Sequence, residues 1–321
     1  MIEECIDSVI AQDFDFPVEI IVHDDASTDG SADLIATRYP QVKLMRNTEN
    51  MGFCVSNNRM VAASHGKYVL LLNNDAVLFK GALLTLYEEA EKLRRPAILS
   101  LPQYAYEGGE LIDNGCFLDP FFYPVPNLDL QRRDVAMVIG ACFWLPKQLW
   151  EELGGFPEWF GSIAEDMYLC CRARLAGYPI LALGISGYQH RAGASFSGEK
   201  RADGKLMTTY RRRALSERNK TFVLVMAWPS PLCWLVLPLH LLLLLLEAAL
   251  LTVLKFDGTL AKRVYFPVFK ALIERRVLLR EERRKLQAQK THESVRAFLA
   301  VCRWWPHKLS LLFRHGLPRI S

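Results

Sequence analysis

The sequence predicts an α/β protein with a mixed sheet flanked by helices, followed by a membrane-associated helical region. Three observations predict this fold class. Strand-like and helix-like segments alternate over the first hundred residues, polar clusters follow two of the strands, and a long apolar run occurs late in the chain. Hydrophobic residues make up 51% and charged residues 23% of the 321 residues, which excludes a disordered chain. The net charge of +4 is too small to indicate nucleic-acid binding.

Helices and strands alternate regularly in the first part of the chain. Apolar residues at helical spacing predict a helix over residues 2–10. A strand over 19–22 leads into a turn-rich segment at 24–30, and an apolar run predicts a buried strand over 68–72. The other elements expected here are helices over 32–38, 55–64 and 83–94 and strands over 42–45 and 97–101. This order is typical of a parallel sheet, which binds ligands at the carboxyl ends of its strands.

The next part of the chain is less regular. Residues 103–134 are rich in Gly, Pro, Asp and aromatic residues, so we expect irregular loops that cover the site. Beyond them we expect a strand or strand pair over 135–145, a helix over 148–153, a helix over 165–176 and a strand over 179–183. Eight cysteines without a CxxC pair predict buried, reduced thiols in a cytosol-like compartment.

A run of 23 almost entirely apolar residues, 232–254, meets the ~20 residues that a helix needs to cross a bilayer. Both flanks are basic, which argues against a single span. A hairpin kinked at Pro229, Pro231 or Pro238 keeps both flanks on one side, and we adopt it as a hypothesis. Mixed basic and apolar residues over 262–284 predict a helix lying on anionic lipid. The expected regions are an α/β domain (1–225), a hydrophobic membrane segment (226–256) and a basic amphipathic tail (257–321).

Carboxylates crowd the turn after the first expected strand, at Asp24, Asp25 and Asp29. Ser27 or Asp29 can cap the next helix, and we favour that role for Asp29. Asp24 lies at the strand end, where a carboxylate can accept a hydrogen bond from a nucleotide base or ribose.

Asn73-Asn74-Asp75 follows the buried strand. A hard divalent cation often takes only one or two carboxylates and completes its shell with phosphates, so Asp75 is a candidate ligand. The alternative is a turn in which Asp75 caps a helix. His190, beside Arg191, is either a group that addresses a diphosphate or a satisfied surface side chain.

Glu165-Asp166 begins a helix after an aromatic segment, residues 159–161. The helix macrodipole favours carboxylates at this position, which is sufficient to explain Glu165. A general base with a raised pKa fits the same setting, so both roles stay open for the pair.

Together these clusters resemble family 2 inverting glycosyltransferases with the GT-A (Rossmann-like) fold. The resemblance covers residues 1 to about 225, and its segments occur in the family's order: 19–31, 50–58, 68–75, 140–141, 154–156 and 165–166. The Asn-Asn-Asp pattern is similar to that of relatives that use deoxyhexoses such as rhamnose, and the C-terminal region resembles the membrane-associated end of bacterial members.

The resemblance implies the site residues: catalytic Asp166 with Glu165 in support, nucleotide-binding Asp24, Ser27, Asn58, Asn73 and Asn74, and metal-binding Asp75 and His190. It implies Mg²⁺ or Mn²⁺, a dTDP-, UDP- or GDP-sugar donor, a glycan or lipid-linked acceptor and no nucleic-acid partner. It also implies a place at the cytoplasmic face of the inner (plasma) membrane, in cell-surface polysaccharide or glycolipid synthesis.

The family has one strand before the helix expected at 2–10. We therefore expect roughly 10–15 residues to be missing, and we favour a misplaced start over a damaged gene. The alternative function is a non-catalytic, membrane-anchored scaffold. A soluble nucleotidyltransferase lacks support, because the sequence contains neither GxxxxGK[ST] nor GxGxxG after a strand.

Overall fold

The computed structural model describes residues 1–191, 200–202, 205–315 and 319–320. Its α-helices are α1 (Ile2–Ile10), α2 (Ser31–Arg38), α3 (Phe53–Ala63), α4 (Ala82–Lys92), α5 (Lys147–Leu153), α6 (Glu165–Leu175), α7 (Tyr210–Ala227), α8 (Leu232–Lys255), α9 (Phe266–Glu274), α10 (Arg276–Ala288), α11 (His292–Ala300) and α12 (His307–His315). A 3₁₀ turn, η1 (Glu158–Phe160), precedes α6, and a π-helical turn, η2 (Ala261–Tyr265), precedes α9.

The strands are mostly short. They are β1 (Ile21–Asp24), β2 (Lys43–Arg46), β3 (Tyr68–Leu72), β4 (Ala76–Leu78), β5 (Ile98–Ser100), β6 (Gln103–Ala105), β7 (Leu111–Asp113), β8 (Cys116–Leu118), β9 (Pro124–Pro126), β10 (Cys142–Pro146), β11 (Ile180–Ala182), β12 (Tyr188–His190), β13 (Lys200–Ala202), β14 (Lys205–Thr208) and β15 (Arg319–Ile320).

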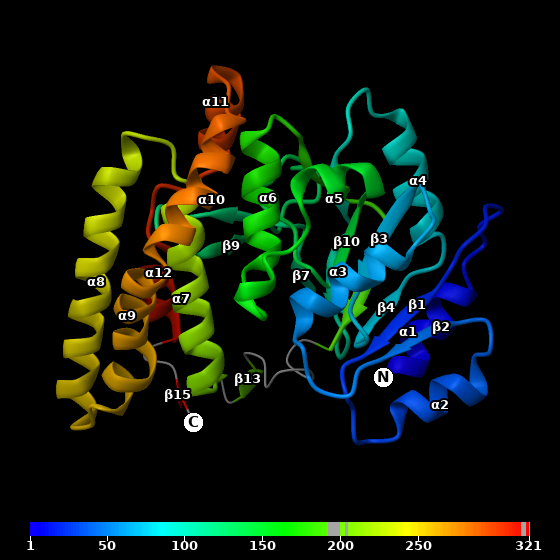
Figure 1. The fold of residues 1–321 in the computed structure, drawn as a ribbon, viewed down its shortest axis with the longest axis horizontal. Helices are drawn as coiled ribbons and strands as arrows, with labels where there is room; N and C mark the ends of the chain where they lie inside the picture. The colour runs from blue at the N-terminus through cyan, green and yellow to red at the C-terminus, as the bar shows by residue number, and fades with distance from the viewer. Residues whose placement is uncertain (192–199, 203–204, 316–318, 321) are drawn as a thin grey trace.

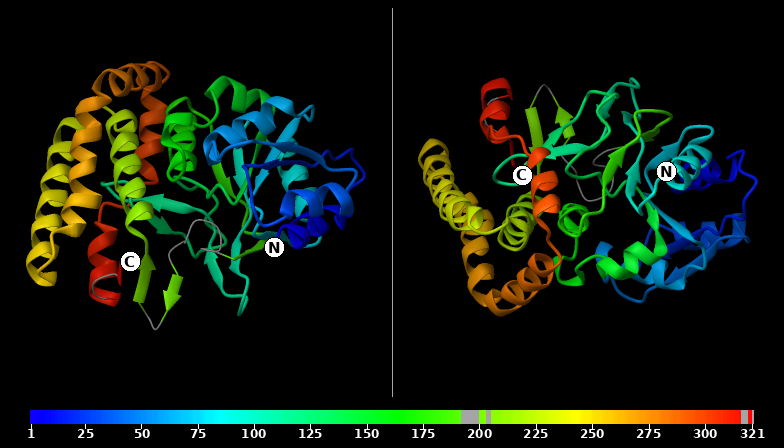
Figure 2. Two further views of the ribbon diagram at one scale, coloured as in Figure 1. Left: turned by 60° about the horizontal axis from the view of Figure 1, so that its bottom comes forward. Right: turned by 90° about the horizontal axis from the view of Figure 1, so that it is seen from above.

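The elements are arranged from one end of the molecule to the other. Helices α7 to α12 gather at one end, β1, β2, α1 and α2 lie at the opposite end, and α6 lies between them (Figure 1). The two further views keep this order (Figure 2). The α/β region and the C-terminal helices are therefore neighbours on either side of α6.

The central sheet has the strand order β11-β5-β10-β3. β11 runs parallel to β5, whereas β10 is antiparallel to both β5 and β3, so the sheet is mixed, as predicted. β1 and β2 form a separate parallel pair. Among the described residues, β1 pairs only with β2 and β3 pairs only with β10.

The expected elements of the first hundred residues are present to within a few residues, and the helix over 2–10 coincides with α1. The expectation of irregular loops over 103–134 is wrong, because β6, β7, β8 and β9 lie there. Three-residue strands are too short to give a periodic signal. Burial supports them instead: Cys116, Phe117 and Leu118 of β8 are all buried in the main core.

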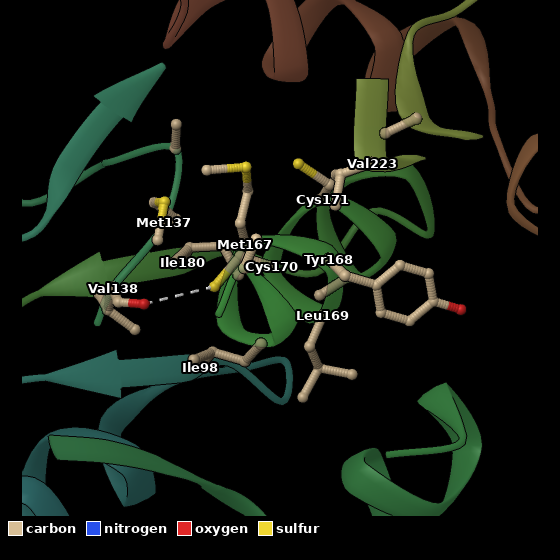
Figure 3. Packing of buried hydrophobic residues seen from close by; sticks show 14 of the residues in the cluster. Ile98, Met137, Val138, Met167, Tyr168, Leu169, Cys170, Cys171, Ile180 and Val223 are labelled. Atoms are coloured by element: carbon tan, nitrogen blue, oxygen red, sulfur yellow. Dashed lines mark hydrogen bonds between the residues drawn. The ribbon is translucent and has the colours of Figure 1, made fainter. Parts of the chain in front are cut away.

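Helix α6 lies in the centre of that core. Its side chains pack toward Ile98 of β5 and Ile180 of β11 on one side and toward Val223 of α7 on the other (Figure 3). Because it is covered on both sides, its first turn has a fixed position relative to the sheet. All eight cysteines are buried and free, as predicted, and Cys170 and Cys171 belong to this packing.

The apolar residues near position 225 do not begin a membrane segment. α7 runs through the expected boundary between residues 225 and 226, and most of its last turns are fully buried in the same core as α6: Phe222, Val223, Leu224, Met226 and Ala227. Of the three prolines offered for a kink, Pro238 lies inside the continuous helix α8, whereas Pro229 and Pro231 lie in the turn between α7 and α8. The first arm of this hairpin, α7, packs in the protein core. Composition alone does not separate an apolar face that meets protein from one that meets lipid.

Helix α8 is long and apolar enough over Leu232–Leu254 to cross a membrane, and only 22% of its most apolar stretch is buried. A core helix of a soluble protein is mostly buried, so this low value supports membrane association. The helix predicted to lie on lipid over 262–284 is instead divided among η2, α9 and α10. Val264, Tyr265 and Val268 pack against α8 rather than lipid.

Candidate active site

A single cavity of about 1840 Å³ connects the carboxyl ends of β1 and β3 with the start of α6 and the first half of α7. The predicted site residues that line it are Asp24, Ser27, Asn73, Asn74, Glu165 and Asp166. The two polar clusters that follow these strands therefore share one cavity. They meet although β1 and β3 belong to different sheets, because both strands end at this cavity.

Asp24 is the last residue of β1, and its Oδ1 accepts a hydrogen bond of 3.4 Å from the Ser27 amide. Asp29 accepts a 3.0 Å hydrogen bond from the Ser31 amide at the start of α2. That contact agrees with the capping role favoured for Asp29, although Gly30 (φ +80°) occupies the cap position itself. All three carboxylates of the turn line the cavity, and Asp24 is the one at the strand end.

Asp25 is a residue to which the sequence analysis gave no role. Its carboxylate accepts 2.8 Å hydrogen bonds from the Asn47 side chain and from the Met51 and Gly52 amides. Burial raises the pKa of Asp25, but these hydrogen bonds outweigh it and leave the pKa below its ordinary value. Asp25 therefore fixes the loop at 50–52.

Gly52 connects this loop to the loop before α6. It has φ +91°, and a Cβ built on it would lie 3.2 Å from the Gly161 carbonyl oxygen. The Cys54 amide donates to the same carbonyl at 3.1 Å. The nucleotide-side loop and the loop that leads to Glu165 are therefore packed backbone to backbone, which requires glycine at position 52.

Asn58 is not brought to the cavity. Its amide group donates to the Phe156 carbonyl at 2.9 Å and accepts from the Phe156 amide at 3.0 Å. Both ends of the side chain are thus used to clamp the segment that follows Gly154-Gly155. The predicted nucleotide-binding role of Asn58 does not fit this position, and its role is to hold that segment.

Asp75 and His190 are brought together, as predicted, because β4 and β12 pair with His190 opposite Ala76. His190 Nε2 lies 3.0 Å from Asp75 Oδ1 and 3.5 Å from Asn73 Nδ2. His190 Nδ1 is buried without a hydrogen-bond partner among the described residues. Asp113, which the sequence analysis did not select, is fully buried nearby, and burial raises its pKa to about 7.

This arrangement fits a divalent cation as half of a site. One carboxylate and one imidazole are accepted by Mn²⁺ and, less readily, by Mg²⁺, with diphosphate oxygens as the remaining ligands. The described part of the chain contains no cluster of three or more His, Cys, Asp or Glu that could hold a metal by itself. A cation here therefore depends on ligands that arrive with the substrate.

Asp166 and Glu165 begin α6 and both line the cavity, but their environments differ. Asp166 accepts hydrogen bonds from the Gly140 amide (3.0 Å) and from the Met167 amide (2.7 Å). Glu165 is buried, and its Oε2 has no hydrogen-bond partner in the described residues. Burial raises the pKa of both carboxyls, and the charge of Asp166 raises that of Glu165 further. Asp166 is therefore the group that carries the negative charge.

Asn219, in α7, holds the loop before this pair. Its buried amide donates to the Ser162 and Ile163 carbonyls at 2.9 and 2.8 Å. Ile163 and Ala164 both have positive φ (72° and 68°), a conformation that non-glycine residues adopt only when their surroundings impose it. No sequence pattern indicates this role of Asn219, because its hydrogen-bond partners are backbone atoms nearly sixty residues away.

The mixed sheet, the cavity at its strand ends and the carboxylate at the start of a helix are features of the GT-A fold class. The crystal structure of GalNAc-T7 with UDP, GalNAc and Mn²⁺ has a similar fold, with a TM-score of 0.52 and 16% identity over 59% of this chain and 40% of that one. Residues 1–154, just under half of the chain, match the model of Glycosyl transferase family 2.

Two curated proteins are similar to this chain in sequence. N-acetylglucosaminyl-diphospho-decaprenol L-rhamnosyltransferase of Mycobacterium tuberculosis (strain ATCC 25618 / H37Rv) is 26% identical over 192 residues, which is 50% of this chain. The match spans 62% of that relative, less than two thirds of its length. Uncharacterized protein Mb1547 of Mycobacterium bovis is 39% identical over 79 residues, 23% of this chain and 22% of the relative.

Proposed function

We propose that this chain is an inverting glycosyltransferase that moves a sugar from a nucleotide-diphosphate donor to a glycan or lipid-linked acceptor. The observation that carries the proposal is the meeting of Asp24, Asn73 and Asp166 in one cavity. The tuberculosis relative is named as a rhamnosyltransferase with a lipid-linked acceptor, and GalNAc-T7 was crystallised with UDP and Mn²⁺. Asp24, Ser27, Asn73 and Asn74 hold the dTDP-, UDP- or GDP-sugar.

The chemistry follows from the position of Asp166. A sugar hydroxyl is a poor nucleophile, so its proton passes to Asp166 as its oxygen attacks the anomeric carbon. That C–O bond forms while the bond to the diphosphate oxygen breaks, and the nucleoside diphosphate leaves with the electron pair. One displacement inverts the anomeric centre. A Mg²⁺ or Mn²⁺ held by Asp75 and His190 would supply positive charge to the leaving diphosphate.

Removal of the metal ligand gives a direct test. Asp75→Asn is expected to weaken nucleotide binding in Mn²⁺ by at least about tenfold, the lower range for damage to a metal site. The measurement is isothermal titration of UDP, dTDP and GDP into the detergent-solubilised chain, with Mn²⁺ and then with EDTA. EDTA should weaken binding to the parent and leave Asp75→Asn unchanged. Unchanged affinity of the parent in EDTA would contradict the metal role.

The membrane location is proposed from α8. Trp234, Leu235, Leu246 and Val253 are among its exposed apolar side chains, each at least 55% exposed. Such a surface suits lipid better than water. We place the catalytic domain at the cytoplasmic face of the inner membrane, where nucleotide-sugars are available and where basic residues near an apolar helix are favoured.

We also propose that one more strand completes the sheet. Residues along the whole length of β1 and β3, together with residues of α1 and α3, line the cavity, and we call the part between the two strands the slot. The starts of the two strands are joined by the Glu19 side chain, which accepts from the Gly66 amide at 3.0 Å. A parallel strand between them that continues into α1 forms a right-handed β-α-β unit. Among the described residues, β1 and β3 each have one edge without a strand partner, and these two edges carry the proposal because buried backbone groups need hydrogen-bond partners.

An extension of the chain tests the slot. Adding the upstream codons in the genomic frame is expected to raise the unfolding midpoint by several degrees, since a few kcal/mol of burial shifts it by about that amount. The amides of β1 and β3 should also gain protection from hydrogen exchange. The control is the same extension with two prolines in the apolar segment, which cannot pair. Equal protection in both forms would contradict the slot, and no nucleotide binding in either would favour the scaffold function.

A further inference from the structure

One arm of the cavity lies beyond Asp166, on the side away from β1. We call it the cationic arm, and its residues are Thr208, Arg211, Arg212, Arg213 and Lys220. All but Thr208 come from the first three turns of α7. Because α6 separates α7 from β1 and β2, this arm is on the side opposite the proposed nucleotide site (Figure 1).

The cationic arm contains buried hydrogen-bond donors without partners. Thr208 is 5% exposed and its Oγ1 has no hydrogen-bond partner among the described residues. Arg213 is 8% exposed and its Nε is likewise unpartnered. A buried polar group without a partner costs about 1–3 kcal/mol, so two at one site indicate a ligand rich in hydrogen-bond acceptors.

The charges of the arm favour an anion. Arg213, Lys220 and Lys308 share only two carboxylates, Glu217 and Glu247, at N–O distances of 2.8 to 3.2 Å. The charges of these five ion-paired side chains sum to +1, and the charge of Asp119 also acts on Lys220. Arg212 makes no ion pair within the described part of the chain, and its charge acts on both Glu165 and Asp166. A positive field therefore extends from the network to the catalytic carboxylates.

The same arm adjoins the apolar helix. α7 and α8 are antiparallel neighbours, since Arg213 lies 3.2 Å from Glu247 and Thr221 lies 2.8 Å from His240. The start of α7 therefore lies beside the C-terminal half of α8. The exposed side chains there are apolar: Leu246, Leu250, Val253 and Leu254. A ligand with an anionic head and a hydrocarbon chain matches both surfaces.

We propose that the cationic arm binds the diphosphate of a prenyl-diphosphate-linked sugar, with the prenyl chain along α8 and the sugar hydroxyl at Asp166. This inference rests on the proposed function and names its acceptor class. It assigns Arg212 and Thr208 to the acceptor rather than to the donor. The other diphosphate that could occupy the arm is that of the nucleotide-sugar, and the experiment separates the two.

The test is binding without turnover. Farnesyl diphosphate, farnesol, inorganic diphosphate and UDP are titrated separately into the full chain in detergent. Farnesyl diphosphate is expected to bind the parent more tightly than either of its two parts. Arg212→Gln and Thr208→Val should each weaken it, by about tenfold for Arg212→Gln because a charged hydrogen bond contributes at least that much. UDP affinity should change less than twofold. Arg284→Gln, at an exposed position of α10, is the charge-matched control.

Each outcome decides one question. Weaker UDP binding in Arg212→Gln, with farnesyl diphosphate unaffected, would assign the arm to the donor and overturn the inference. If inorganic diphosphate and farnesyl diphosphate bind with equal affinity, the prenyl chain makes no contact and that part of the inference is overturned. UDP binding to the parent without farnesyl diphosphate binding would overturn the acceptor site alone, whereas failure of UDP binding with metal present would count against the proposed function itself.

Discussion

Replacing Asp166 with Asn is expected to lower kcat by about 10³, within the range that general-base catalysis contributes, and to leave nucleotide affinity unchanged. The Gly140 amide donates to Oδ2 of Asp166 and the Met167 amide donates to Oδ1, so asparagine keeps one of these two hydrogen bonds. Loss of the other costs about 1–3 kcal/mol, less than the usual stability of a domain. The fold should therefore survive while the proton acceptor is lost. The measurement is transfer of the sugar from the nucleotide-sugar at saturating acceptor, together with calorimetric titration of UDP.

Glu165→Gln is the matched control for this substitution. Burial keeps Glu165 in its neutral form, which glutamine resembles in charge and shape, so we expect less than a tenfold loss. The pH profile adds an independent readout. Because burial raises the pKa of Asp166, activity should fall at higher pH than for a free aspartate as the solution is acidified. Full turnover by Asp166→Asn would show that another group is the base.

The sequence predicted the parts of the site that depend on strand ends. Asp24 and the Asn73-Asn74-Asp75 segment follow strands that the apolar pattern defines, and the ends of those strands are where such folds bind ligands. That the two strands belong to separate sheets was not predicted. The sequence also predicted that Asp75 and His190 belong together, although the strand pairing that joins them was not predicted. Asp25, Asn58 and Asn219 show the limit, because each side chain bonds mainly to backbone groups distant in sequence. No composition or periodicity reports such partners.

The prediction for the C-terminal region was partly wrong for a different reason. Residues 221–228 and 232–254 are both apolar, yet the first segment packs inside the domain and the second is largely exposed. The two segments differ in what covers them. Leu279 of α10 and Phe298 of α11 pack in the core around α7, so these helices bury the first segment. The polar residues of α7 indicate that it packs in protein. Arg213, Glu217 and Lys220 recur at helical spacing and form ion pairs with one another.

Glu217 is the residue whose loss should cost the most stability. It is fully buried and pairs with Arg213 (3.1 Å), Lys220 (3.2 Å) and Lys308 (2.8 Å), so it joins α7 to α12 and, through Arg213 and Glu247, to α8. Glu217→Gln leaves those cations with one carboxylate in place of two. Breaking a buried pair in this way costs about 3–5 kcal/mol, and we expect that loss of unfolding free energy at pH 7 in detergent.

The pH dependence distinguishes this network from ordinary packing. Burial raises the pKa of Glu217, but Lys220, Lys308 and Arg213 outweigh it and hold the pKa well below its usual value. A carboxyl with a lowered folded-state pKa stabilises the fold above its unfolded-state pKa of about 4.3, and this stabilisation is lost as the pH falls through the folded-state value. The difference in unfolding free energy between the parent and Glu217→Gln should therefore be constant from about pH 5 to 7 and shrink below about pH 4. It should also change near pH 8, because burial lowers the pKa of its partner Lys220 to about 8. Glu274→Gln, which breaks only the exposed pair with Lys270, should cost less than about 1 kcal/mol at every pH. An equal cost for both variants would mean that water reaches Glu217, and the cationic arm would then lose the buried charge network on which its positive field depends.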